Sequence, residues 1–164
     1  MITWRSSLAD NEGISIKTPL SGDVLPVTSH PDLLYNANVL PAALCIKLTQ
    51  GKLLAPFSGV CTFSLQYNRR ISINHRSGLI LHIEFCAKLF AQNSKQKQLI
   101  CAGNVVAGQQ LMSIELPANQ QNACYAVVML SNHHSISEVW TCQRQVIAGT
   151  DPLLIIKQKN QVKE

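Results

Sequence analysis

The sequence predicts an all-β protein, an antiparallel β sandwich or barrel of many short strands with one or two short helices. Short segments alternate apolar and polar residues, as strands with one buried face do. Turn residues such as Gly and Pro separate these segments. The sequence lacks the alternation of strand and long helix patterns that is typical of parallel sheets, which further favours an antiparallel fold.

The expected strands differ in how deeply they should be buried. Two segments alternate cleanly and should have one exposed face: residues 60–65 and 112–116. Three segments are richer in apolar residues and should be more buried: residues 79–85, 125–130 and 153–157.

One hairpin turn and a little helix are also expected. Arg76-Ser77-Gly78 should form the turn before residues 79–85, because Gly78 can adopt a positive φ. Ser135-Ile136-Ser137-Glu138 matches a capping box and should open about two turns of helix. Residues 31–34 should form one short helical turn, and residues 94–102 a second short helix.

Length and composition indicate one globular domain. The chain has 164 residues, of which 46% are hydrophobic and 14% charged, so it can bury a core and is not of disordered composition. We expect residues 1–13 to be a flexible arm and residues 14–164 to form the domain. No apolar run approaches the roughly 20 residues of a membrane span, and no secretory signal is visible.

The spacing of the cysteines and the distribution of charge argue against several classes of function. The six cysteines are widely spaced without a C-x-x-C pair, so neither a metal site nor a redox motif is indicated, and we expect a reducing, cytoplasmic compartment. The net charge is +5, but Lys and Arg do not form a dense block with aromatic residues. Nucleic-acid binding is therefore not expected. The sequence indicates no cofactor.

Several short motifs occur in an order and spacing that one known family shares. They are Thr18-Pro19-Leu20-Ser21-Gly22, His30-Pro31-Asp32 with Tyr35, Leu54-Ala55-Pro56-Phe57-Ser58-Gly59, Ile71-Ser72-Ile73 with Ser77-Gly78, Val105 to Gly108, Val127 to Asn132, and Val146 to Lys157. Over about residues 14–157 this set resembles the glucose-type enzyme IIA family of bacterial sugar phosphotransferase systems.

The resemblance implies an antiparallel β sandwich and a role in phosphate relay. In that family a strand histidine accepts phosphate from a histidine phosphocarrier protein and passes it to a membrane sugar permease. A second histidine supports the first, and partners dock on an apolar face around the pair. The resemblance thus implies protein partners from a sugar phosphotransferase or regulatory system, with membrane contact only through a permease.

The histidine pair of the family is not intact in this chain. If the hairpin is aligned without gaps through Ser77-Gly78, Glu84 occupies the phosphoacceptor position and Arg69 the supporting position. A second alignment, counted back from Val105 to Gly108, removes two residues and makes His82 a displaced acceptor. Strand side chains repeat every two residues, so His82 and Glu84 should share one solvent-accessible face in either alignment.

Glu84 and His82 each have a structural interpretation and a functional one. Glu84 either replaces the phosphohistidine as a fixed negative charge or pairs with Arg69 across the hairpin. His82 is either the acceptor or a partly buried, hydrogen-bonded histidine. As a remote alternative, His82 and Glu84 could hold zinc, as strand histidines do in the distantly related lysostaphin-type peptidases, but a third protein ligand would be needed.

The leading hypothesis is an enzyme IIA-like module with lost or weakened phosphotransfer that acts by binding proteins. The alternatives are an active phosphocarrier using His82 and, remotely, a zinc hydrolase. Arg69, Arg70 and Lys88, with Arg76 in the turn, would make the docking region cationic. We therefore expect weak binding to an ordinary phosphocarrier, and capacity for an acidic partner or an anion.

Overall fold

The computed structural model describes residues 1–10, 12–36, 42–64, 70–86, 89, 102–118, 123–131 and 134–159. Within these residues the largest sheet has eight strands. Its spatial order is β13 (Gln145–Val146), β3 (Gly22–Pro26), β4 (Ala43–Leu48), β11 (Tyr125–Ser131), β8 (Ile80–Phe85), β7 (Arg70–Asn74), β6 (Gly59–Ser64) and β9 (Gly103–Val105). All neighbouring strands of this sheet run antiparallel.

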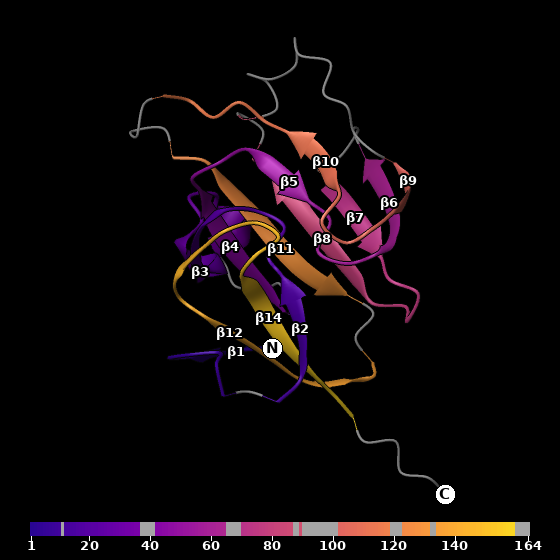
Figure 1. Ribbon diagram of the computed structural model, residues 1–164. Coiled ribbons are helices and arrows are strands. Elements are labelled where there is room, and N and C mark those ends of the chain that lie inside the picture. Colours follow the sequence, from indigo (N-terminus) through magenta and orange to yellow (C-terminus); the bar gives the residue numbers. More distant parts are fainter. Residues whose placement is uncertain are drawn as a thin grey trace, which may run out of the picture.

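Two smaller sheets complete the described strands. One has the order β1 (Ile2–Arg5), β12 (Ile136–Cys142), β14 (Pro152–Gln158) and β2 (Ile14–Lys17), and the other pairs β10 (Gln110–Ser113) with β5 (Lys52–Leu54). Figure 1 shows β14 and β2 in front of the strands of the large sheet. The helices whose bounds the structure describes are η1 (Val27–Ser29) and α1 (Leu33–Asn36). No helix in the described part of the chain is long and apolar enough to cross a membrane.

The main core fills the space between the large sheet and the β1-β12-β14-β2 sheet. From the large sheet it takes Leu44, Ile46, Ile71, Ile73, Leu81 and Ile83, and from the smaller sheet Ile16, Val139, Leu154 and Ile156. Alternation places every second residue of each strand in this layer. The fold is thus the predicted antiparallel β sandwich.

A second, smaller apolar cluster lies on the other face of the large sheet. It contains Val27, Ala43, Cys45, Val127 and Met129, with Leu25, Tyr35 and Tyr125 packed against it. Cys45 and Val127 are opposite each other in the register of β4 and β11, and Met129 is opposite His82 in that of β11 and β8. This outer face of the sheet therefore also carries the candidate site.

Most of the expected strands are present at nearly the expected bounds. Residues 60–65, 79–85, 125–130 and 153–157 correspond to β6, β8, β11 and β14. The hairpin turn is confirmed, with Gly78 at a φ of 89°. Residues 112–116 are only partly a strand, because β10 ends at Ser113.

The helix predicted from Ser135-Ile136-Ser137-Glu138 is wrong. Residues from Ile136 onward form β12, which pairs with β14 and β1. Val139, Trp140 and Thr141 favour a strand, and pairing on both sides outweighs a local capping pattern. The short turn expected at residues 31–34 occurs as α1, two residues later. Of the helix expected at residues 94–102, only Ala102 lies within the described residues, and it is in no element.

The N-terminal residues differ from the flexible arm that we expected over residues 1–13. β1 pairs in parallel with β12, with Ile2 opposite Val139 and Arg5 opposite Cys142. Leu8 is buried in a small cluster with Trp140 and Ile155. Burial of Leu8 and the β1 pairing together tie this segment to the small sheet.

Candidate functional site

β8 places His82 and Glu84 side by side on the outer face of the large sheet. Each faces a residue of β7 in register: Ser72 lies opposite His82, and Arg70 lies opposite Glu84. The shared face that alternation predicted is therefore confirmed. Leu81, Ile83 and Phe85, which alternate with His82 and Glu84 along β8, are buried in the main core.

Glu84, however, is buried and not accessible to solvent as predicted. Only 4% of the residue is exposed. Arg70 donates to one carboxylate oxygen, Oε1, with Nη2 at 2.5 Å and Nε at 2.6 Å. The hydroxyl of Tyr35, from α1, donates to the other oxygen, Oε2. Both oxygens of the carboxylate are therefore engaged, as a buried charge requires.

The pairing partner of Glu84 also differs from the prediction. Arg69 was the partner considered for a structural role of Glu84, whereas the residue in register with Glu84 is Arg70. Arg69 and Lys88 both lie outside the described residues. The supporting role predicted for Arg69 therefore stays a prediction.

His82 is half-buried and is held by two serine hydroxyls. Its Nδ1 lies 2.7 Å from Ser72 Oγ on β7, and its Nε2 lies 2.7 Å from Ser131 Oγ at the end of β11. Burial lowers the pKa of His82 below its ordinary value of 6.5; the nearby Arg70 charge lowers it further, and Glu84 opposes this. The imidazole is thus mainly neutral at pH 7.

A neutral imidazole has one nitrogen lone pair, which is what a phosphoryl acceptor needs. Here one serine hydroxyl must donate to that lone pair, while the other accepts from the ring N–H. Nucleophilic attack by His82 therefore first requires a serine hydroxyl to turn away. On the described part of β7, the residue opposite His82 is Ser72, not a second histidine.

Sequence reasoning missed two participants, His30 and Tyr35, in this site. His30 is 2% exposed, and its ring lies edge-on to those of Tyr35 and Tyr125, with centroids 4.6 and 5.7 Å away. Its Nδ1 accepts a hydrogen bond from the backbone N–H of Asp32 at 3.0 Å. His30 and Tyr35 belong to the motif that pointed to the family, so the motif marked the segment without indicating its contact with Glu84.

Next to Tyr35, α1 exposes two large apolar side chains. Leu33 is 80% exposed and Leu34 is 77% exposed. Tyr35 connects this pair to Glu84 through its hydroxyl. The site therefore consists of a closed polar cluster with an apolar projection beside it.

The described residues do not supply the ligands of the remote zinc hypothesis. No three His, Cys, Asp or Glu side chains among them are grouped closely enough to hold a metal ion. His75 lies beyond the end of β7, in the turn of the hairpin, and its Nδ1 contacts Ser77. Glu84 is already engaged by Arg70 and Tyr35.

Comparison with known proteins identifies relatives of this arrangement. Residues 14–135 match the family model described as phosphoenolpyruvate-dependent sugar phosphotransferase system, EIIA 1. The glucose-specific EIIA component of Haemophilus influenzae is 20% identical over 152 residues, which cover 88% of this chain and 90% of that protein. The glucose-specific EIICBA component of Staphylococcus carnosus is 24% identical over 120 residues, 72% of this chain.

The chain matches only a small part of the multidomain relatives. It covers 18% of the Staphylococcus carnosus glucose-specific EIICBA component and 16% of the glucoside-specific one. Among solved structures, glucose permease IIA from Mycoplasma capricolum superposes with a TM-score of 0.67 at 15% identity. That match covers 90% of this chain and 97% of the Mycoplasma chain, and it supports the sandwich fold.

Proposed function

Because the chain belongs to the EIIA 1 family of the phosphoenolpyruvate-dependent sugar phosphotransferase system, we propose that it is an EIIA component that binds partner proteins and has lost or weakened histidine phosphotransfer. One observation carries this proposal. The carboxylate of Glu84, at the position where the resemblance expects the acceptor, is 4% exposed and enclosed by Arg70 and Tyr35.

An enclosed carboxylate is a poor substitute for an acceptor histidine. A phosphoryl donor must reach an oxygen lone pair, but Arg70 occupies Oε1 and Tyr35 occupies Oε2. Freeing either oxygen would leave a buried charge without one of its partners, which is unfavourable by several kcal/mol in comparable pairs. Glu84 thus acts as a structural anchor between α1 and the β7–β8 hairpin.

Glu84 is equally unsuited to imitate a phosphorylated state. A phosphohistidine would present negative charge to a partner, whereas the adjacent Arg70 guanidinium neutralises Glu84 within 2.6 Å. The same pairing removes Arg70 from the cationic surface that we expected. Capacity for an acidic partner or anion therefore rests on Arg69, Lys88 and the exposed Arg76.

The exposed pair Leu33 and Leu34 favours recognition by apolar contact. The centre of a protein interface is apolar and becomes fully buried on binding, which suits two adjacent leucines that are exposed in the free chain. We propose that a protein of the sugar phosphotransferase system covers this pair. The relatives bear the names of glucose, glucoside and N-acetylglucosamine systems, so a hexose-type system is the proposed setting.

Incubation with phosphoenolpyruvate, enzyme I and the phosphocarrier of the same organism tests the proposal. We expect no acid-labile phosphate on the wild-type protein, or a small amount that His82→Ala removes. His134→Ala is the matched control, because His134 is exposed and belongs to neither β8 nor its paired strands. Strong labelling that persists in His82→Ala would overturn this account of the site.

A working phosphocarrier on His82 is the second candidate, and one observation favours it. Burial keeps the imidazole neutral, and Ser72 and Ser131 hydroxyls lie 2.7 Å from its nitrogens. After a rotation of one hydroxyl, that serine could donate to a phosphoryl oxygen. In the same assay this candidate requires near-stoichiometric labelling of the wild type that His82→Ala abolishes.

A further inference from the structure

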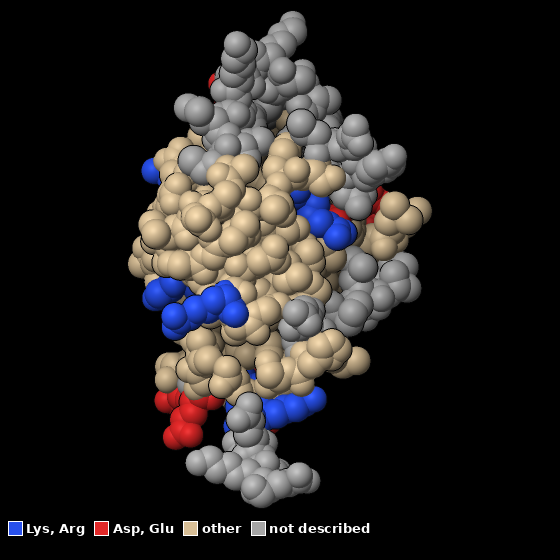
Figure 2. All heavy atoms as spheres, turned by 90° about the vertical axis from the view of Figure 1, so that its right-hand side faces the viewer, with Lys and Arg blue, Asp and Glu red and all other residues tan. Residues whose placement is uncertain are grey.

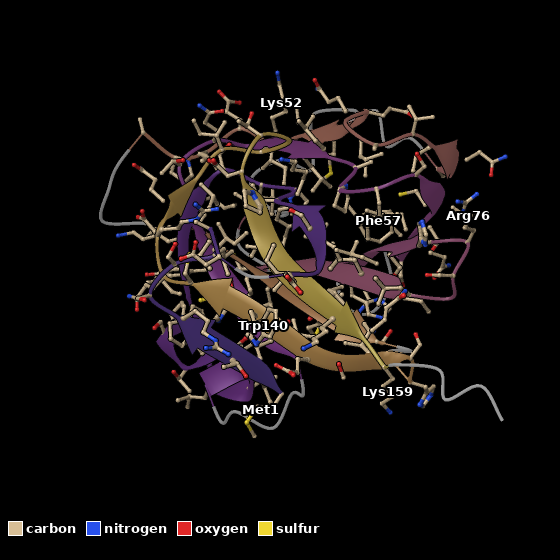
Figure 3. The ribbon with its side chains drawn as sticks, turned by 60° about the horizontal axis from the view of Figure 1, so that its bottom comes forward. Met1, Lys52, Phe57, Arg76, Trp140 and Lys159 are labelled. Carbon is tan, nitrogen blue, oxygen red and sulfur yellow. The ribbon has the colours of Figure 1, made fainter. Side chains whose placement is uncertain are left out.

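A small apolar pocket opens between the β1-β12-β14-β2 sheet and the turn of the β7–β8 hairpin. Its volume is about 150 Å³. Ile16, Ile136 and Ile156 of the smaller sheet form one wall, and Phe57 and Leu79 form the other. Figure 3 shows Phe57 between the β2–β14 pair and the turn that carries Arg76. Ile16 and Ile156 belong to the main core and Phe57, Leu79 and Ile136 pack against it, so the pocket lies on the opposite side of the large sheet from His82.

The described lining of the pocket carries no Lys, Arg, Asp or Glu side chain. Its polar groups are those of His75 and Ser77 in the hairpin turn, together with Ser15, Ser135 and Gln158. The side of the molecule that faces the viewer in Figure 2, on the right in Figure 1, is likewise mostly uncharged. A charged ligand would lose its hydration here without gaining a counter-ion, so the lining selects a neutral one.

His75 gives the pocket a hydrogen-bond donor of defined tautomer. The backbone N–H of Ser77 donates to His75 Nδ1 at 3.2 Å, and Ser77 Oγ lies 2.8 Å from the same nitrogen. Nδ1 is therefore the acceptor, and the proton of the neutral ring is on Nε2. The ring is further fixed by its edge-on contact with Phe57, at 5.4 Å between centroids.

We propose that this pocket binds a small, neutral, mostly apolar molecule with one hydrogen-bond acceptor, such as a phenol-sized alcohol or ketone. A volume of about 150 Å³ is large enough for a benzene-sized ring. The apolar walls take up the ring, and the Nε2–H of His75 meets the oxygen. Since both sheets line the pocket, a bound molecule adds contacts across the sandwich and stabilises the fold by mass action.

Titration with phenol, followed by amide chemical shifts of the ¹⁵N-labelled protein, tests this site directly. We expect saturable shifts at Phe57, Ser77, Leu79 and Ile136, with a Kd on the order of 1 mM for a ligand of this size. Toluene, of nearly equal size but without the oxygen, should also bind, through the apolar walls alone. Shifts that do not saturate, or that spread over the whole surface, would overturn the proposal.

Two variants test the apolar wall and the hydrogen-bond donor of the pocket separately. Ile136→Trp fills the pocket and should weaken phenol binding at least tenfold, while Ile147→Trp, at an isoleucine that is 58% exposed and outside the lining, should leave the Kd unchanged. His75→Phe keeps the ring but removes the donor, so phenol should then bind about threefold to tenfold more weakly, whereas toluene should not. Unchanged phenol affinity in a folded Ile136→Trp or in His75→Phe contradicts the assignment, and the wild-type titration decides should Ile136→Trp not fold.

Discussion

Arg70 approaches Glu84 with two nitrogens directed at a single carboxylate oxygen, Nη2 at 2.5 Å and Nε at 2.6 Å. The Arg70 side chain is 36% exposed, whereas that of Glu84 is 5% exposed. The pair is therefore asymmetric: the cation keeps part of its hydration, and the anion depends on its protein partners. Loss of the cation should harm the fold more than loss of a surface charge elsewhere.

Arg70→Met should lower the free energy of unfolding by about 2–3 kcal/mol, because Glu84 then remains buried without its counter-ion. This loss is at the low end of the range for breaking a buried ion pair, since Arg70 is partly hydrated. Urea denaturation measures it. Arg76→Met, at an exposed arginine of the same hairpin, is the control and should change stability by less than about 0.5 kcal/mol.

A second substitution makes this test sharper. Glu84→Gln should destabilise the wild type but restore stability in the Arg70→Met background, because it removes the unpaired charge. If Glu84→Gln has the same effect in both backgrounds, the two side chains are not coupled and the ion pair contributes little to stability.

Tyr35→Phe should destabilise the protein by about 1.5–3 kcal/mol, the range for losing a hydrogen bond to a charged group. The ring and its contacts with His30 are kept, so the change isolates the hydroxyl that donates to Glu84. Thermal unfolding of wild type and variant measures the loss. The same substitution in a Glu84→Gln protein should have a smaller effect. An equal effect would show that the hydroxyl stabilises the fold through a contact other than the one with Glu84.

The fold could be predicted because its signals are local. Alternation in the segments around β6 and β8, and the turn at Gly78, depend on neighbouring residues alone. The capping-box pattern before β12 is just as local, but there the answer depends on β1 and β14, which lie far away in the sequence. A short helix in that place would have left β1 without the strand it pairs with here, and β14 paired on its β2 side alone.

The site was predictable only in part for the same reason. Period-two alternation was enough to place His82 and Glu84 on one face. It could not show that Tyr35, 49 residues earlier, reaches Glu84, nor that the register pairs Glu84 with Arg70 and not with Arg69. Burial of a charge depends on such distant contacts, so the predicted exposure of Glu84 was wrong.

Leu33→Ser combined with Leu34→Ser should leave stability unchanged to within about 0.5 kcal/mol, because both side chains are mostly exposed. The same double variant should weaken binding to the phosphotransferase-system partner at least tenfold if this pair is the centre of the interface. Calorimetric titration with the permease domain of the same organism measures the binding. Val106→Ser, at a residue that is 63% exposed on another part of the surface, is the control. Equal weakening by the control would show that no defined docking site exists at α1.

The last prediction concerns the dependence of stability on pH. Burial lowers the pKa of His82 below the ordinary 6.5; the Arg70 charge lowers it further, and Glu84 raises it. Burial also lowers the pKa of His30 below 6.5, and Asp32 raises it. Between the lowered pKa values and about pH 6.5 the unfolded chain binds protons that the folded protein does not. Stability is therefore fully present above about pH 6.5 and falls as the pH drops towards the lowered pKa values, by at most about 1.4 kcal/mol per pH unit for each histidine.

His82→Gln, whose amide can still contact Ser72, should make this decline shallower. His134→Gln, at an exposed histidine, should leave it unchanged. Urea denaturation at pH 5.0, 5.5, 6.0, 6.5 and 7.0 compares the three proteins, with the ~0.5 pH spacing chosen to resolve a slope of that size. A decline of the same steepness in His82→Gln would mean that His82 is charged as readily in the folded protein as in the unfolded chain, and that burial beside Arg70 does not hold it neutral.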